Sequence, residues 1–120
     1  MNAHDKTEEG FSVGRTNLAG ATVLAPSASL TFESCGELRS SLEAACGEQT
    51  PVVVLDCRAV AFMDSTALEL LMDFHAKLRA NQVELRLTHL NDVCSDILTV
   101  SRLVHTLVVC EGISQAIKDG

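Results

Sequence analysis

The chain has 120 residues, of which 47% are hydrophobic, and a formal net charge of −7. A single domain of this size buries roughly two-thirds of its unfolded surface, so it forms a core without metal or disulfide support. The acidic balance argues against direct binding of nucleic acid or of an anionic membrane surface, and the absence of Trp and Tyr leaves few rings for stacking bases.

The chain begins with a polar, acidic segment. Residues 1–10 show no apolar pattern, and we expect them to form a flexible tail before a single domain of residues 11–118. The segment lacks the features of a signal peptide, and no apolar run approaches the roughly 20 residues that span a membrane. The sequence therefore predicts a cytoplasmic protein without membrane insertion.

Two strands and a helix are expected next. Residues 11–13 favour a short edge strand, and residues 21–24 (ATVL) favour a second strand that Pro26 interrupts. A helical pattern opens near Ser34 and ends at Gly47, a residue type common after the last helical turn. Its expected inner face consists of Leu38, Ser41, Leu42 and Ala45.

The middle of the chain carries the strongest hydrophobic signals. The uninterrupted apolar run at residues 52–55 (VVVL) predicts a strand that is buried on both faces. Apolar side chains then recur at three- and four-residue steps, which predicts a helix from Ser65 to about Asn81. That periodic set is Ala67, Leu68, Leu71, Phe74, His75 and Leu78.

The last third continues the alternation. Residues 83–88 alternate apolar and polar side chains, which predicts a strand with one buried face. Asn91 or Asp92 can cap a third helix, residues 107–109 favour a last strand and residues 112–118 a closing helix. The apolar residues of the third helix are Val93, Ile97 and Leu98. This order predicts a small single-domain α/β sandwich, with helices packed on a mixed, mostly parallel β-sheet.

The residue types that usually mark an enzyme are scattered. Five cysteines and four histidines form neither a C-x-x-C nor an H-E-x-x-H pattern, so we expect free thiols and no metal site. The chain also lacks a G-x-S-x-G elbow, a P-loop and a G-x-G-x-x-G fingerprint. We therefore expect no catalytic residue and no cofactor.

The segment AFMDSTALELL joins an apolar stretch to an amphipathic helix through three oxygen-bearing side chains, Asp64, Ser65 and Thr66. Phe62 and Met63 are expected to enter the core and to fix the direction of the helix. Either Asp64 or Ser65 suits the N-cap, where a side-chain oxygen accepts an unpaired backbone N–H. Spacing alone favours this capping role over a functional one.

The longer stretch VVVLDCRAVAFMDSTALELL resembles the signature of STAS domains, especially of bacterial anti-sigma factor antagonists. In that family a buried strand ends in Asp, and a Phe-x-Asp-Ser-(Ser/Thr)-Gly-Leu segment precedes a helix. The matching residues are Asp56, Phe62, Asp64, Ser65, Thr66 and Leu68. In the order and length of its elements, the resemblance extends over residues 11–117.

The resemblance implies a non-enzymatic regulator that is switched by phosphorylation. An anti-sigma factor with serine kinase activity would bind the unmodified chain, release its sigma factor and so change transcription. The same kinase would phosphorylate Ser65, and a PP2C-type phosphatase would reset it. The partner-binding residues that the resemblance implies are Leu30, Thr31, Asp64, Ser65 and Thr66.

Two positions depart from the family pattern. Ala67 replaces the glycine after the hydroxyl pair, and of the family's Gly-x-Leu-Asp stretch only Leu30 remains, with Thr31 in place of the acid. The missing acid favours an alternative, a STAS subunit of another assembly such as a lipid-transport ABC ATPase complex or a stress-signalling complex. The intact Asp-Ser-Thr segment favours the antagonist.

Overall fold

The computed structural model describes residues 11–48 and 50–118, and the structural statements below refer to these residues. The expected flexible tail at residues 1–10 lies outside them. No described helix is long and apolar enough to cross a membrane.

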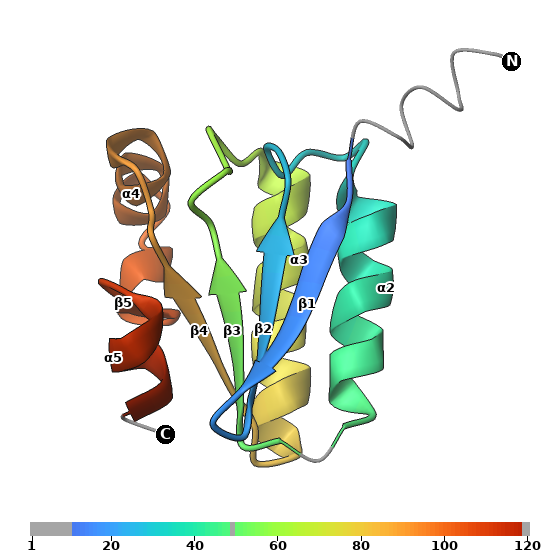
Figure 1. The fold of residues 1–120 in the computed structure, drawn as a ribbon. Helices are drawn as coiled ribbons and strands as arrows, with labels where there is room; N and C mark the ends of the chain where they lie inside the picture. The colour runs from blue at the N-terminus through green and yellow to red at the C-terminus, as the bar shows by residue number, and fades with distance from the viewer. Residues whose placement is uncertain (1–10, 49, 119–120) are drawn as a thin grey trace, which may run out of the picture.

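A five-stranded sheet forms the centre of the molecule (Figure 1). Its strands follow the chain order, with β1 antiparallel to β2 and every later neighbour parallel. The elements are β1 (Val13–Leu18), β2 (Ala21–Pro26), α2 (Cys35–Cys46), β3 (Val52–Asp56), α3 (Ser65–Ala80), β4 (Glu84–Thr88), α4 (Asp92–Val100), the 3₁₀ helix η1 (Leu103–His105), β5 (Val108–Cys110) and α5 (Ile113–Lys118). The predicted α/β sandwich with a mixed, mostly parallel sheet is confirmed.

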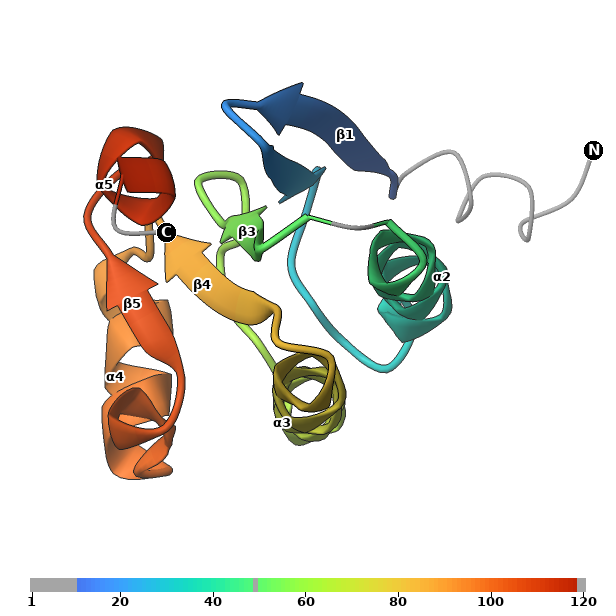
Figure 2. The same ribbon diagram turned by 90° about the horizontal axis from the view of Figure 1, so that it is seen from below.

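The larger core lies between the sheet and helices α2, α3 and α4, which cover the same face (Figure 2). The predicted periodicity of α3 is confirmed at its centre, since Leu71, Phe74 and Leu78 are at most 1% exposed. The strand β3 is buried along its whole length, as its uninterrupted apolar run predicts. In α4, however, Cys94 rather than Val93 faces the core, and Val93 is exposed.

Helix α5 covers the opposite face of the sheet. The prediction that residues 83–88 form a strand with only one buried face is therefore wrong. Both Arg86 and Thr88 are buried, although they alternate with the core residues Leu85 and Leu87. The guanidinium of Arg86 is ion-paired with Glu84 and donates to the main-chain carbonyl of Ala116 in α5. A second small core of apolar side chains lies beneath this helix, at Ala21, Val23, Val52, Val54, Cys110 and Ala116.

The first strand is longer than predicted. The expected edge strand at residues 11–13 is instead β1, which pairs with β2 from Val13↔Pro26 to Leu18↔Ala21. Pro26 is therefore the last residue of β2, where it lies opposite Val13 of β1 and beyond the end of the pairing between β2 and β3. Most of β1 is exposed on both faces, so its side chains carry no apolar alternation that the sequence could reveal.

Candidate functional site

Two loops run side by side at the carboxyl ends of β2 and β3, where open α/β sheets usually place functional groups. Leu30, after β2, and Met63, after β3, form an isolated parallel bridge. The Leu30 N–H donates to the Phe62 carbonyl at 3.1 Å, and the Asp64 N–H donates to the Leu30 carbonyl at 3.0 Å. The two loops thus continue the parallel pairing of their strands up to the first turn of α3.

A serine side chain reinforces this pairing. Ser29 Oγ accepts hydrogen bonds from the main-chain N–H groups of Ala61 and Phe62, both at 3.2 Å. These two N–H groups of the loop before α3 are therefore hydrogen-bonded to a side chain of the neighbouring loop. Such a loop holds the residues that follow it in a fixed position.

Asp64 is the N-cap of α3, which settles the choice that the sequence leaves open between Asp64 and Ser65. Its Oδ1 accepts the N–H of Ala67 at 2.9 Å. Its Oδ2 accepts the N–H of Phe32 in the other loop, also at 2.9 Å. One half-buried carboxylate therefore both begins the helix and ties the two loops together.

The structure brings the five predicted partner-binding residues to this one edge, but it exposes them unequally. Ser65 and Thr66 are exposed in the first turn of α3, whereas Leu30 is completely buried. Thr31 is half-buried, and its Oγ1 accepts the N–H of Glu33 at 3.3 Å. Leu30 consequently supports the edge from beneath, while the two hydroxyl side chains are on its surface.

Two phenylalanines extend this edge, and sequence reasoning missed both. Phe32 is 69% exposed and Phe62 is 46% exposed, so the expectation that Phe62 enters the core is wrong. Met63 is buried as expected. Because successive residues of an extended segment point in opposite directions, only one of Phe62 and Met63 can face inward. The sequence offers only a weak signal for these rings, namely that two of its four phenylalanines follow the ends of predicted strands.

A shallow groove adjoins Ser65 on the side of α4 and η1. It has a volume of about 420 Å³. Leu68 and Met72 of α3 and Leu103 of η1 supply its apolar lining, and acidic side chains stand at its border. The complete lining is Ser65, Leu68, Glu69, Met72, Asp73, Ser101 and Leu103.

The signature residue Asp56 has a structural role at the ends of β3 and β4. Its buried carboxylate accepts the N–H of Arg58 at 3.1 Å and lies 3.3 Å from Arg58 Nε. The same carboxylate lies 3.1 Å from His89 Nδ1, just beyond β4. Asp56 thus ties together the ends of two neighbouring strands.

The cysteines are free thiols, as predicted, and four of the five are buried. Burial raises the pKa of the Cys57 thiol far above its ordinary value, and the neighbouring Cys94 and Asp56 raise it further. A thiol held protonated is a poor nucleophile. Within residues 11–48 and 50–118, no group of three or more His, Cys, Asp or Glu side chains has the arrangement of a metal site.

The sequence of residues 15–117 matches the STAS domain family. The chain belongs to the STAS family. A comparison with curated proteins gives no significant match. The fold, by contrast, has many relatives among solved structures.

Two of these structural relatives of the STAS domain are anti-sigma factor antagonists. The one from Mycobacterium paratuberculosis is 17% identical, with a TM-score of 0.82 and coverage of 91% of this chain and 92% of that one. The one from Planctomyces limnophilus is 21% identical, with a TM-score of 0.81 and coverage of 90% and 97%. A sulfate transporter family protein from Wolinella succinogenes is 20% identical, with a TM-score of 0.74 and coverage of 86% of each chain. At these identities the likeness establishes the fold alone.

Proposed function

We propose that this STAS domain is an anti-sigma factor antagonist and that phosphorylation of Ser65 switches it off. In its unmodified form it binds an anti-sigma factor that has serine kinase activity, and so it regulates transcription indirectly. The kinase modifies Ser65, and a PP2C-type phosphatase restores the hydroxyl. The protein acts in the cytoplasm as a non-enzymatic partner, without contacting nucleic acid or entering the membrane.

The observation that carries this proposal is the exposure of Ser65 on a rigid support. Ser65 follows Asp64 directly, and both carboxylate oxygens of Asp64 are engaged by backbone N–H groups. The hydroxyl is therefore accessible to a kinase while its backbone is held in place. Thr66, Phe32 and Phe62 are also exposed at this edge of the sheet, and they give it the mixed polar and aromatic character that suits a protein interface.

The electrostatics of this edge favour a switch that leaves the fold intact. A phosphate on Ser65 adds about −1.5 to −2 charges at the first turn of α3, where the helix dipole favours an anion. The same charge lies next to the carboxylate of Asp64 in the sequence, and at an interface it brings repulsion and a desolvation cost. Phosphorylation therefore weakens binding more than it weakens folding.

The decisive experiment is to incubate the purified protein with candidate anti-sigma factor kinases and ATP, and to locate phosphate by mass spectrometry. We expect one phosphate on Ser65, binding of the unmodified form and release of the modified form. Ser65→Ala should bind the kinase and acquire no phosphate, whereas Thr66→Ala should still be modified. Binding with no phosphate at Ser65, or phosphate only at Thr66, would refute the switch.

A second function is favoured by one departure from the family pattern. Thr31 stands where antagonists carry an acid, and its hydroxyl is used within its own loop by the N–H of Glu33. This supports the alternative of a STAS subunit in another assembly, such as a lipid-transport ABC ATPase complex or a stress-signalling complex. Co-purification of the chain with a transport ATPase, together with no affinity for any anti-sigma kinase, would select that alternative.

A further inference from the structure

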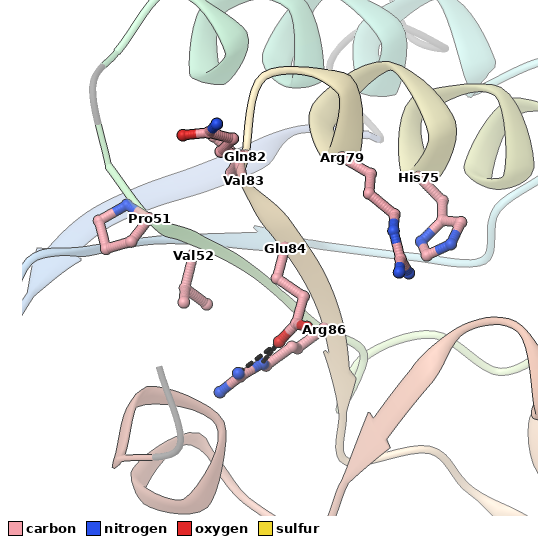
Figure 3. Close-up of a pocket in the computed structure, with 8 residues that line it drawn as sticks. All are labelled: Pro51, Val52, His75, Arg79, Gln82, Val83, Glu84 and Arg86. Atoms are coloured by element: carbon pink, nitrogen blue, oxygen red, sulfur yellow. Dashed lines mark hydrogen bonds and ion pairs between the residues drawn. The ribbon is translucent and has the colours of Figure 1, made fainter.

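A second cavity lies at the other end of α3, away from the edge that carries Ser65. Its volume is about 430 Å³, within the usual range for sites that bind small molecules. Figure 3 shows that side chains from α3 and β4 reach toward it from different sides. The lining residues are Pro51, Val52, His75, Arg79, Gln82, Val83, Glu84 and Arg86.

The cavity arises from a difference in length between two neighbouring strands. β5 pairs with β4 only over Arg86–Thr88, so on that side the start of β4 extends beyond its partner. Glu84 and Arg86 line the cavity from this part of β4, and His75 and Arg79 line it from α3. Because His75 and Arg79 are four residues apart on a helix, their side chains lie on the same side.

The charges around the cavity do not balance. Arg86 is ion-paired with Glu84 and also donates to the Ala116 carbonyl, so this pair is close to neutral. Arg79 is exposed and, among the described residues, makes no ion pair or hydrogen bond with its side chain. An uncompensated guanidinium therefore borders the cavity, in a chain whose formal net charge is −7.

His75 supplies an independent observation. Its side chain is only 9% exposed, and its Nδ1 is buried with no hydrogen-bond partner among the described residues. Buried polar atoms are almost always hydrogen-bonded, so an unpaired one is destabilising and calls for a partner. The charged groups that share the cavity with His75 are Arg79 on its own helix and Glu84 and Arg86 on β4.

From these two unused groups we infer that the cavity binds a small organic anion through a carboxylate or phosphate group. The planar guanidinium of Arg79 pairs with two oxygens of such a group, the geometry in which arginine binds these anions best. His75 Nδ1 is buried in the free protein, so it donates to the same group, from the tautomer that carries the proton on Nδ1, only after the imidazole ring turns toward the cavity. Pro51, Val52 and Val83 offer an apolar surface to the rest of the molecule.

The test is an NMR titration of the full, ¹⁵N-labelled chain with inorganic phosphate and, separately, with succinate. Sodium chloride at matched ionic strength controls for general screening. We expect saturable shifts in the backbone amides of Val52, Gln82, Val83 and Glu84 with at least one of the two anions. Saturation by phosphate alone assigns a phosphate ligand, and saturation by succinate alone assigns a carboxylate.

Variants tie the binding to the two proposed groups. Arg79→Gln should weaken the affinity by at least about tenfold, because it removes the ion pair and its two aligned donors. His75→Gln keeps a polar side chain and should weaken it less, while its amide spectrum reports whether the fold is kept. Arg39→Gln, an exposed arginine on α2, is the matched control and should bind like the wild type. Shifts that do not saturate with either anion, or an equal loss in Arg79→Gln and Arg39→Gln, would overturn the inference.

Discussion

Asp64 and Phe32 are 32 residues apart in the sequence, yet Asp64 Oδ2 accepts the backbone N–H of Phe32 at 2.9 Å. The other oxygen of the same carboxylate caps α3 through the N–H of Ala67. The acid of the Asp-Ser-Thr segment is therefore committed to structure. It positions Ser65 and joins the loop of Phe32 to the helix that displays the hydroxyl.

The first prediction follows from this double role. Asp64→Ala should lower the free energy of unfolding by about 1–3 kcal/mol, since it removes a helix cap and leaves a second N–H without its acceptor. Asp73→Ala, which removes an exposed acid further along the same helix, should change it by less than about 0.5 kcal/mol. Urea denaturation followed by circular dichroism measures both. Equal stabilities of the two variants would show that the Asp64 bonds contribute nothing.

The second prediction separates stability from switching at Ser65. Because Asp64 and not Ser65 is the cap, Ser65→Ala should change the unfolding free energy by less than about 0.5 kcal/mol. Ser65→Asp should also fold normally, since an acid in the first helical turn is favourable. Its affinity for the kinase partner should nevertheless fall at least roughly tenfold, or about 1.4 kcal/mol.

The control for this charge effect is Ser40→Asp, which adds the same charge to an exposed position of α2. It should bind the partner as the wild type does. Calorimetric titration of the partner with the three variants measures the difference. Wild-type affinity in Ser65→Asp would leave Ser65 without a role as a switch.

Local patterns in the sequence predicted most of the fold. The run VVVL marked β3, the three- and four-residue steps marked α3, and Gly47 marked the end of α2. The prediction failed where burial depends on a distant element. Arg86 looks like a solvent-facing residue of an alternating strand, and only the docking of α5 makes it buried. No local pattern contains that information.

The sequence proposes residues for the candidate site, but it does not predict their geometry. The Asp-Ser-Thr segment at a strand-to-helix junction indicated the position of Ser65, which is indeed exposed. The contact between Asp64 and Phe32 joins two loops that the sequence separates by a whole helix and strand. The exposure of Phe62 also depends on which alternate side chains of an extended segment face the core. A shift of one residue would bury Phe62 and expose Met63.

The third prediction concerns the two exposed aromatic rings. Phe32→Ala should weaken binding of the kinase partner by at least about tenfold, because buried aromatic side chains often dominate interface energies. The same change should hardly affect stability, as the ring is 69% exposed in the free protein. Val100→Ala, at a side chain that is 82% exposed on α4, is the control and should bind normally. A binding loss no larger in Phe32→Ala than in Val100→Ala would place the interface elsewhere.

The last prediction concerns alkaline pH and follows from the buried thiols. Burial raises the pKa of Cys57 in the folded protein above the ordinary value of 9.0, and it raises the pKa values of Cys35, Cys46 and Cys94 in the same direction. Below about pH 9 these thiols are protonated in both the folded and the unfolded chain, so the stability they support is fully present. Above that pH the unfolded chain releases protons that the folded chain retains, and the balance moves toward unfolding.

The free energy of unfolding should therefore fall as the pH rises above about 9, with the completely buried Cys57 thiol contributing up to about 1.4 kcal/mol per pH unit. In Cys57→Ala the free energy of unfolding should be lower at every pH, because a buried side chain is lost. Between about pH 9 and 11, however, it should fall less steeply with pH than in the wild type, because the contribution of the Cys57 thiol is missing. The slope is the informative quantity, since a purely steric effect of the substitution is the same at every pH. Urea denaturation at half-unit steps of pH measures it, and parallel curves for the two proteins would mean that Cys57 ionises as readily in the folded chain as in the unfolded one.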